Sequence, residues 1–186
     1  VSGTPKVRFD GQGGLLAVAL HPDYVHTGWI YLAYSDRATN GNNPNLGLTA
    51  IVRGKIREHR WEEEQTIFRA PARFYKPSNI HFGTRLVFDG KGHLFFSIGE
   101  RGEKENAQDL TRPNGKVPRI MEDGQVPPDN PFVTTPEAFP TIWGYGNRNP
   151  QGLALHPVSG ELWETEHGPR GGDELNWIRP GLNYGW

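Results

Sequence analysis

The segment Leu86-Val-Phe-Asp-Gly-Lys-Gly-His-Leu-Phe-Phe-Ser-Ile98 has the pattern of a β-hairpin. An apolar run leads into an Asp-Gly turn, and a second run rich in aromatic residues follows. The same pattern occurs once before and once after this segment. The last apolar residues of the three first runs are Leu20, Phe88 and Leu155, which are 68 and 67 residues apart. The sequence therefore predicts three copies of one structural unit.

Further strand candidates lie between the three hairpins, at 50–57, 65–69, 116–121 and 141–145. Each unit then holds about four strands, which is the strand content of a β-propeller blade. About three blades fit this chain, whereas closed propellers have about four to eight. We therefore expect an all-β fold in which residues 1–186 form one partial propeller domain, with flanking parts missing on both sides. A β-sandwich with three similar hairpins is the alternative.

Two segments are expected to lie outside the strands. Arg60–Glu64 is highly charged and is predicted to be a solvated connection. Asn40–Asn45 is rich in Asn, Gly and Pro, which is typical of a loop tip. No segment has the pattern of a long helix.

The composition agrees with a turn-rich β fold and excludes several kinds of protein. The chain has 24 glycines and 16 prolines, which suit turns better than helices. With 20 basic and 21 acidic residues, the net charge of −1 gives no support for a nucleic-acid partner. The absence of cysteine excludes disulfides and thiolate metal sites. The apolar runs are too short for a membrane-spanning helix, which needs about 20 residues.

Polar residues gather where the predicted hairpins begin and end. His81 precedes the first strand of the second hairpin and Glu100 follows its second strand, so both can lie at the same end of the sheet. A histidine beside a carboxylate is the pairing that a general base needs. The alternative is a histidine held by the backbone and a solvated glutamate, since the run 100–105 is typical of an exposed charged loop. Gln12 lies before the first hairpin in a Gly-rich segment, and that pattern by itself favours a turn over a binding role.

A denser polar cluster surrounds the third hairpin. Arg148 precedes its first strand and could bind an anionic ligand through two hydrogen bonds. Gly168 and Pro169, which follow its second strand, expose main-chain carbonyls, and Asp173 and Glu174 add carboxylates. Carbonyl and carboxylate oxygens are the ligands of Ca²⁺. A Gly-rich turn with charged residues facing water is the alternative.

Several ordered motifs extend from residue 11 to the last residue. They are Gly11-Gln-Gly-Gly-Leu-Leu, Ala19-Leu-His-Pro-Asp, His81-Phe-Gly-Thr-Arg-Leu-Val-Phe, Ser97-Ile-Gly-Glu-Arg-Gly, Asn114-Gly-Lys, Arg148-Asn-Pro-Gln-Gly-Leu-Ala, Thr165-Glu-His-Gly-Pro-Arg-Gly-Gly-Asp-Glu-Leu-Asn and Gly181-Leu-Asn-Tyr-Gly-Trp. With these motifs the chain resembles the soluble PQQ-dependent aldose sugar dehydrogenases, which are related to soluble quinoprotein glucose dehydrogenase.

The resemblance implies a six-bladed β-propeller that carries PQQ and Ca²⁺ on its axis. It implies oxidation of an aldose at C1 to the lactone, with the hydride passing to the quinone and then to an external electron acceptor. It also implies a periplasmic or secreted location. The residues after Trp186 would hold the PQQ carboxylates, so this chain alone is expected to bind PQQ weakly or not at all and to be inactive.

The resemblance also implies roles for individual residues. His81 matches the general base, Glu100 the carboxylate that orients it, and Gln12 a glutamine on the side of substrate and cofactor. Arg148 and Asn149 match residues that contact PQQ, and Arg148 joins His81 and Glu100 as a catalytic residue.

The implied metal sites use other residues. Gly168 and Pro169 match the carbonyl donors to the active-site Ca²⁺, while Glu174 and Tyr184 match ligands of a second, structural Ca²⁺. Asn147 departs from the family, which commonly has histidine at this position. Two alternatives from other classes stay open, namely a non-catalytic propeller that binds a sugar or a protein and a calcium-dependent propeller lactonase. The sequence leaves the oligomeric state undetermined.

Overall fold

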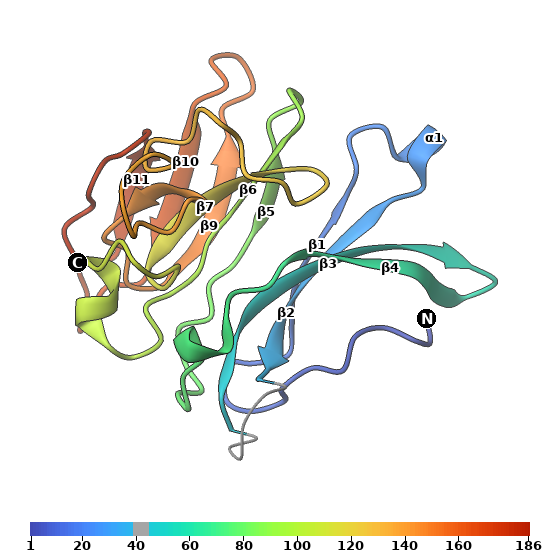
Figure 1. Cartoon of the computed structure of the whole chain (residues 1–186), viewed down its shortest axis with the longest axis horizontal. Coiled ribbons are helices and arrows are strands. Elements are labelled where there is room, and N and C mark those ends of the chain that lie inside the picture. The colour runs from blue at the N-terminus through green and yellow to red at the C-terminus, as the bar shows by residue number, and fades with distance from the viewer. Residues whose placement is uncertain (39–44) are drawn as a thin grey trace.

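The computed structural model describes residues 1–38 and 45–186 and shows three antiparallel sheets that follow one another along the chain (Figure 1). The first sheet contains β1 (Leu15–Leu20), β2 (Ile30–Arg37), β3 (Gly47–Arg57) and β4 (Arg60–Phe68). The second contains β5 (Leu86–Phe88), β6 (His93–Phe96), β7 (Lys116–Met121) and β8 (Ile142–Tyr145). The third contains β9 (Pro150–Leu155), β10 (Leu162–Glu166) and β11 (Glu174–Ile178). The strands of each sheet lie side by side in chain order.

The three hairpins expected from the sequence are confirmed as β1–β2, β5–β6 and β9–β10. The Asp-Gly turn between β5 and β6 is held by the carboxylate of Asp89. Its Oδ1 accepts hydrogen bonds from the backbone N–H of Lys91 and His93, at 2.7 and 3.1 Å. This local bonding explains why the turn could be recognised from the sequence.

Helices are short in the described part of the chain. One α-helical turn, α1 (Tyr24–Thr27), separates β1 from β2, and 3₁₀ turns occupy Ala72–Phe74 and Lys104–Ala107. None of the described helices is long and apolar enough to cross a membrane.

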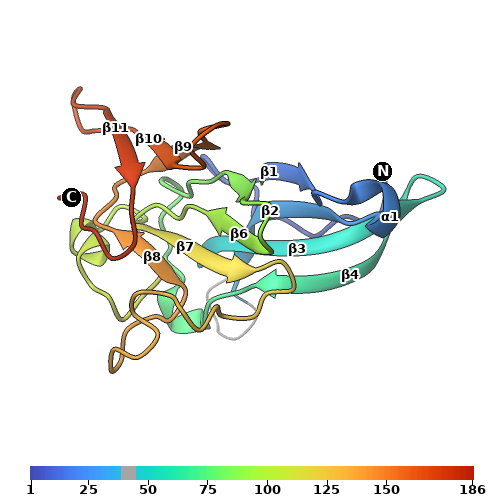
Figure 2. The same cartoon turned by 90° about the horizontal axis from the view of Figure 1, so that it is seen from above.

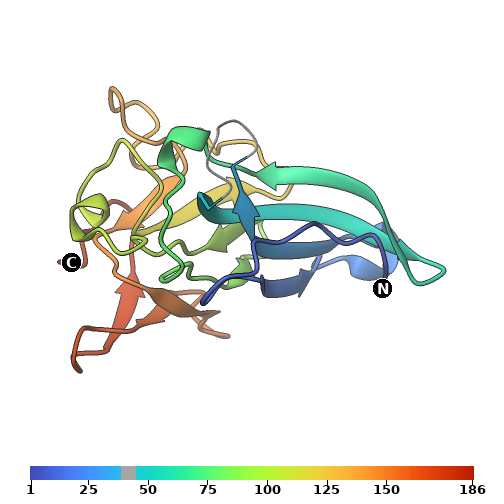
Figure 3. The ribbon, with the colours of Figure 1, turned by 90° about the horizontal axis from the view of Figure 1, so that it is seen from below.

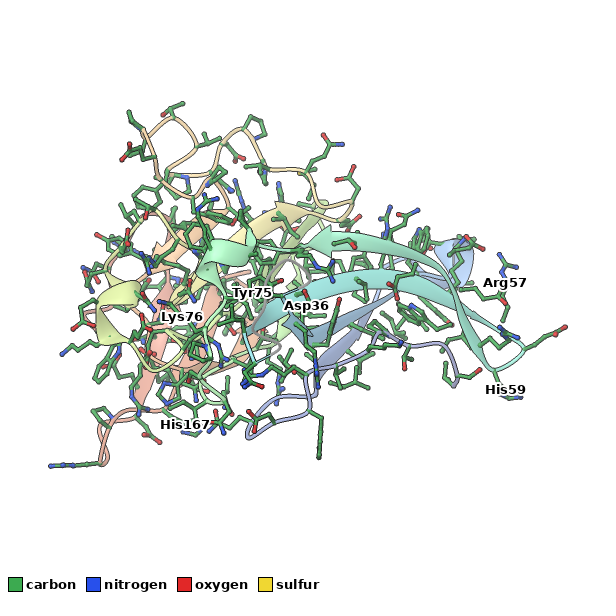
Figure 4. The ribbon with its side chains drawn as sticks, turned by 60° about the horizontal axis from the view of Figure 1, so that its bottom comes forward. Asp36, Arg57, His59, Tyr75, Lys76 and His167 are labelled. Carbon is green, nitrogen blue, oxygen red and sulfur yellow. The ribbon has the colours of Figure 1, made fainter. Side chains whose placement is uncertain are left out.

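The expected connection at Arg60–Glu64 is wrong, because this segment is the first half of β4. Trp61 is buried against the first sheet and donates its indole N–H to Glu64 at 2.8 Å, while most of the charged side chains of the segment face solvent. The β3–β4 hairpin projects away from the other two sheets, with Arg57 and His59 at its tip (Figure 4). The expected loop tip at Asn40–Asn45 lies outside the described residues, apart from Asn45.

Pro118 lies inside β7 rather than interrupting it. The strand continues through Pro118, and the register with β8 shifts between Val117 and Pro118. A shift at this point lets the strand pair without the N–H that proline lacks.

The first strands of the three sheets lie next to each other, since β1 contacts β5 and β5 contacts β9 (Figure 2). Apolar side chains fill the space between neighbouring sheets. Between the first and second sheets the core includes Tyr31, Ile51, Phe68, Phe96 and Ile120. Between the second and third it includes Phe95, Val117, Leu153, Leu162 and Ile178.

This packing brings together six strand ends, two from each of the three hairpins. In each hairpin the residues before the first strand and those after the second lie at the same end, because the strands are antiparallel. The central sheet is contacted by its neighbours on both sides, so the corresponding loops of all three sheets gather at one end (Figure 3). The polar motifs identified in the sequence occupy these loops.

Candidate functional site

His81 and Glu100 form a buried pair at the end of the second sheet. The imidazole Nδ1 lies 2.6 Å from Glu100 Oε1, and the two residues are only 7% and 2% exposed. A carboxylate can only accept here, so Nδ1 carries the proton and donates it to Glu100. The lone pair is then on Nε2, which is the form of imidazole that can accept a proton.

The backbone around His81 is held in an unusual conformation. His81 has a φ of +55°, a region that non-glycine residues seldom adopt and that often marks functional sites. Its N–H donates to Gln12 Oε1 at 2.7 Å, while the N–H of Gln12 donates to Asn79 O at 2.8 Å. Gln12 therefore joins the first sheet to the segment that carries His81.

Gly99 gives this segment the space that it needs. A Cβ atom at position 99 would lie 2.2 Å from the carbonyl oxygen of His81, which is far too close for any real contact. The chain after β6 and the backbone of His81 can approach each other only because residue 99 has no side chain.

We expect Gly99→Ala in the full-length protein to lower the free energy of unfolding by about 1–3 kcal/mol, because the methyl group must push the His81 backbone away. Thermal unfolding measures this effect. Gly144→Ala is the control, since its Cβ would come nearest to the side-chain atoms Ile178 Cγ2 and Tyr184 Cε2, at 3.3 and 3.4 Å, with the nearest backbone atom, Leu182 O, at 3.8 Å. An equal loss of stability in both variants would show that the overlap with His81 is relieved without cost.

The expectation of an exposed loop at 100–105 is wrong at its first two residues. Glu100 is buried against His81, and Arg101 is completely buried. Only the later charged residues, Glu103, Lys104 and Glu105, face solvent.

The loop before β9 is connected to this pair through the backbone. The N–H of Glu100 donates to the carbonyl of Arg148 at 2.9 Å. On its other side, the N–H groups of Arg148 and Asn149 both donate to Glu166 Oε2, at 2.5 and 3.3 Å. Burial raises the pKa of the Glu166 carboxyl to about 7, although these two N–H groups oppose the shift.

The side chain of Arg148 faces the loop that follows β10. Its Nη1 donates to the carbonyls of His167 and Gly168, at 2.8 and 3.2 Å. The N–H of Gly168 in turn donates to Asp173 Oδ1 at 3.0 Å. His167 lies far from the tip of the β3–β4 hairpin (Figure 4).

The chain is similar in sequence to the proteins of one known family. Residues 1–186 match the model of the glucose/sorbosone dehydrogenase family. The chain belongs to this family. It is 44% identical to the aldose sugar dehydrogenase YliI of Escherichia coli (strain K12), covering 100% of the chain and 49% of that protein. It is 31% identical to quinoprotein glucose dehydrogenase B of Acinetobacter calcoaceticus, covering 95% of the chain and 40% of that protein.

A solved structure shows the same similarity. The PQQ-bound form of an aldose sugar dehydrogenase from Streptomyces coelicolor superposes with a TM-score of 0.81 at 34% identity, covering 98% of the chain and 50% of that structure. The chain thus spans about half the length of the curated relatives that it matches.

The residues considered for metal binding are less closely grouped than His81 and Glu100. Gly168 and Pro169 lie in one loop, at the end of β10, and Glu174 begins β11. The Tyr184 hydroxyl donates to Trp177 O and accepts from the N–H of Arg179, both at 2.7 Å. Trp177 is three residues along the strand from Glu174, about 10 Å away, so the Tyr184 hydroxyl and Glu174 are not brought together.

The loop after β10 offers oxygen atoms of the main chain and the nearby carboxylate of Asp173. Among residues 1–38 and 45–186, no group of three or more His, Asp or Glu side chains is arranged to hold an ion. The carbonyls at the end of β10 and the nearby carboxylate of Asp173 provide hard oxygen donors, which suit Ca²⁺. A Cβ at Gly168 would lie 2.2 Å from Gly172 O, so the loop folds tightly back on itself.

Buried polar atoms beside the Arg148 loop show that a polar cofactor fits the chemistry of the site. Within the described residues, no hydrogen-bond partner is found for Glu100 Oε2, Asn149 Oδ1 or either amide atom of Asn147. Buried groups of this kind normally have a partner. Of these atoms Asn147 Nδ2 can donate to a carbonyl or carboxylate oxygen of a cofactor, whereas the three oxygens can accept from an N–H or O–H group.

The cavity beside this site is not the largest cavity in the described part of the structure. A cavity of about 370 Å³ lies beside the loop after β10 and is lined in part by Glu166, His167 and Glu174. A larger cavity, of about 510 Å³, lies at the opposite ends of the strands, where Asp89 and Trp143 contribute to its wall.

Sequence reasoning missed three buried residues of the site. Glu166 was recognised only as part of a motif, although its carboxylate holds the Arg148 loop. Asn147 was noted only as a departure from the family, and Arg101 was placed in an exposed loop. The available signal was position in the chain, since Arg101 and Asn147 lie directly beside predicted site residues and Glu166 lies two residues before Gly168.

Proposed function

We propose that this chain forms the base-bearing part of a PQQ- and calcium-dependent dehydrogenase that oxidises aldoses at C1 to lactones. The observation that carries the proposal is the buried pair of His81 and Glu100, connected by hydrogen bonds to Arg148 and the loop after β10. Family membership and the PQQ-bound relative support it.

In the proposed reaction His81 is the general base. Its Nε2 would accept the proton of the C1 hydroxyl as the C1–O bond becomes the lactone carbonyl, and bound PQQ would supply the acceptor for the C1 hydride. Glu100 keeps the proton on Nδ1 and stabilises the imidazolium that forms. Gln12 fixes the backbone of His81 through a hydrogen bond, and in this proposal it also faces the substrate and the cofactor.

The cofactors supply what side chains cannot. PQQ would act as the two-electron acceptor, and Ca²⁺ would act as a Lewis acid. In this proposal Arg148 and Asn149 contact PQQ, with Arg148 also stabilising charge during catalysis, and the carbonyls of Gly168 and Pro169 hold the ion. Glu174 and the main chain of Tyr184 are assigned to a second, structural Ca²⁺.

The rest of the proposal follows from the family resemblance. The three sheets would be three blades of a six-bladed propeller, with the adjoining β1, β5 and β9 nearest its axis. Residues 1–186 would be one partial domain, in a periplasmic or secreted protein that passes electrons to an external acceptor.

Reconstitution of the full-length protein tests the function. The purified apo protein is mixed with PQQ and Ca²⁺ and supplied with aldoses and a redox dye. We expect a PQQ absorption spectrum that stays with the protein, aldose-dependent dye reduction and a lactone product. No bound PQQ and no dye reduction would exclude the dehydrogenase, and lactone hydrolysis without PQQ would favour the lactonase instead.

A further inference from the structure

Arg101 makes its contacts on both sides of His81. Its Nη1 donates to the carbonyl of Ile80 and its Nη2 to the carbonyl of Ser78. Its guanidinium also stacks on the ring of Phe82, with Cζ 3.4 Å from the ring centroid. Arg101 therefore contacts the residue before His81 and the residue after it.

We propose that Arg101 is a positioning residue that fixes the His81 imidazole against Glu100. Glu100 and Arg101 are adjacent in the chain and act on the same segment. Glu100 binds the imidazole, while Arg101 holds the backbone on either side of it. Together they restrain both the side chain and the main chain of a residue whose φ is +55°.

A second arginine holds the beginning of the same segment. Arg8, which is 3% exposed, donates to the carbonyls of Ser78 and Pro77, at 2.7 and 2.9 Å. Both guanidinium groups therefore share the Ser78 carbonyl as an acceptor. The segment that carries His81 is bound by two buried cations, and planar guanidinium groups are suited to such multiple donation.

The burial of Arg101 is costly, which argues that more than fold stability is involved. Burial and, to a smaller extent, the positive charge of Arg8 lower the pKa of Arg101 to about 9, although Glu100 opposes the shift. In the described part of the chain no carboxylate oxygen is within ion-pair distance of Arg101, and its Nε has no hydrogen-bond partner. A buried charge without a close ion pair destabilises a fold, so an apolar residue would serve packing alone better.

The test observes the His81 Nδ1 proton directly in the apo form of the full-length protein. A short imidazole–carboxylate hydrogen bond shifts this proton far downfield in the ¹H NMR spectrum. His93 provides an internal control, because its Nδ1 lies 2.7 Å from Asp89 Oδ2 at the other end of the sheet. His81→Gln and His93→Gln assign the two signals.

We expect Arg101→Met to remove or broaden the His81 signal and to leave the His93 signal unchanged. Arg101→Lys keeps the positive charge but lacks the planar fork that stacks on Phe82 while two separate nitrogens reach two carbonyls, so it should also broaden the His81 signal. Retention of a sharp His81 signal in Arg101→Lys would overturn the proposal. If Arg101→Met does not fold, and the His93 signal is lost as well, the Arg101→Lys result decides.

The catalytic consequence rests on the proposed function, whereas the NMR result does not. In the protein loaded with PQQ and Ca²⁺ we expect Arg101→Lys to lower kcat by about 10–100-fold with little change in KM, because the base is misplaced. An unchanged kcat beside a broadened His81 signal would contradict the catalytic part. A wild-type protein without dehydrogenase activity would refute the proposed function and leave the positioning role standing.

Discussion

His81→Gln in the full-length protein is expected to lower kcat for aldose oxidation by about 10²–10⁴-fold, the usual contribution of a general base. Glutamine has a similar polar reach but cannot accept the C1 hydroxyl proton at neutral pH. PQQ affinity should change little, because the proposed PQQ contacts are Arg148 and Asn149. Steady-state dye reduction and titration of the apo protein with PQQ measure the two quantities separately.

His93→Gln is the matched control for this prediction. The Nδ1 of His93 also lies 2.7 Å from a carboxylate, but His93 begins β6, beside the β5–β6 turn at the opposite end of the sheet. We expect its kcat to stay within about twofold of the unmodified protein, as is usual for changes remote from the reacting atoms. Loss of PQQ binding and of kcat in equal measure by His81→Gln would contradict the assignment of His81 as the base.

Lys116→Met is expected to cause the largest loss of stability, about 3 kcal/mol or more. Lys116 is completely buried, and its Nζ donates to the carbonyls of Asn106, Ala107 and Asn114, at 2.8, 3.0 and 2.8 Å. Methionine fills a similar volume but donates to none of them. Each buried carbonyl left without its donor costs about 1–3 kcal/mol.

Denaturant unfolding of the full-length protein measures this loss, with Lys104→Met as the control. Lys104 is exposed and places its Nζ 4.7 Å from the centroid of the Trp186 ring, so its replacement should change stability by less than about 1 kcal/mol. Equal effects of the two substitutions would show that water replaces the Lys116 ammonium without cost. The result also concerns the site, since the neighbouring Gly115 carbonyl accepts the N–H of Asn147.

The sequence predicted the parts of the fold that depend on local interactions. The β5–β6 hairpin is marked by an aspartate that bonds its own turn, and this signal needs no knowledge of the rest of the molecule. The proximity of His81 and Glu100 then followed, because the two strands of a hairpin end together. The family resemblance supplied the roles of residues that no local pattern could assign.

Properties set by distant contacts were not predictable in this way. Arg101 belongs to a charged run that is typical of a surface loop, but the segment 78–82 packs over it and buries it. The charged residues of β4 concealed a strand whose partner is β3 and whose buried residue is Trp61. The engagement of the Tyr184 hydroxyl by the backbone at Trp177 and Arg179 likewise depends on how the last residues return to β11.

The hydrogen bonds from His81 to Gln12 and from Glu100 to Arg148 join loops of three different sheets. Each of these bonds closes a long stretch of chain, and the entropy lost in closing it is recovered only when the sheets have docked. A single repeat carries only some of the site residues, even when its own strands form fully. Competence for chemistry should consequently emerge late in folding, in one cooperative step with the docking of neighbouring repeats.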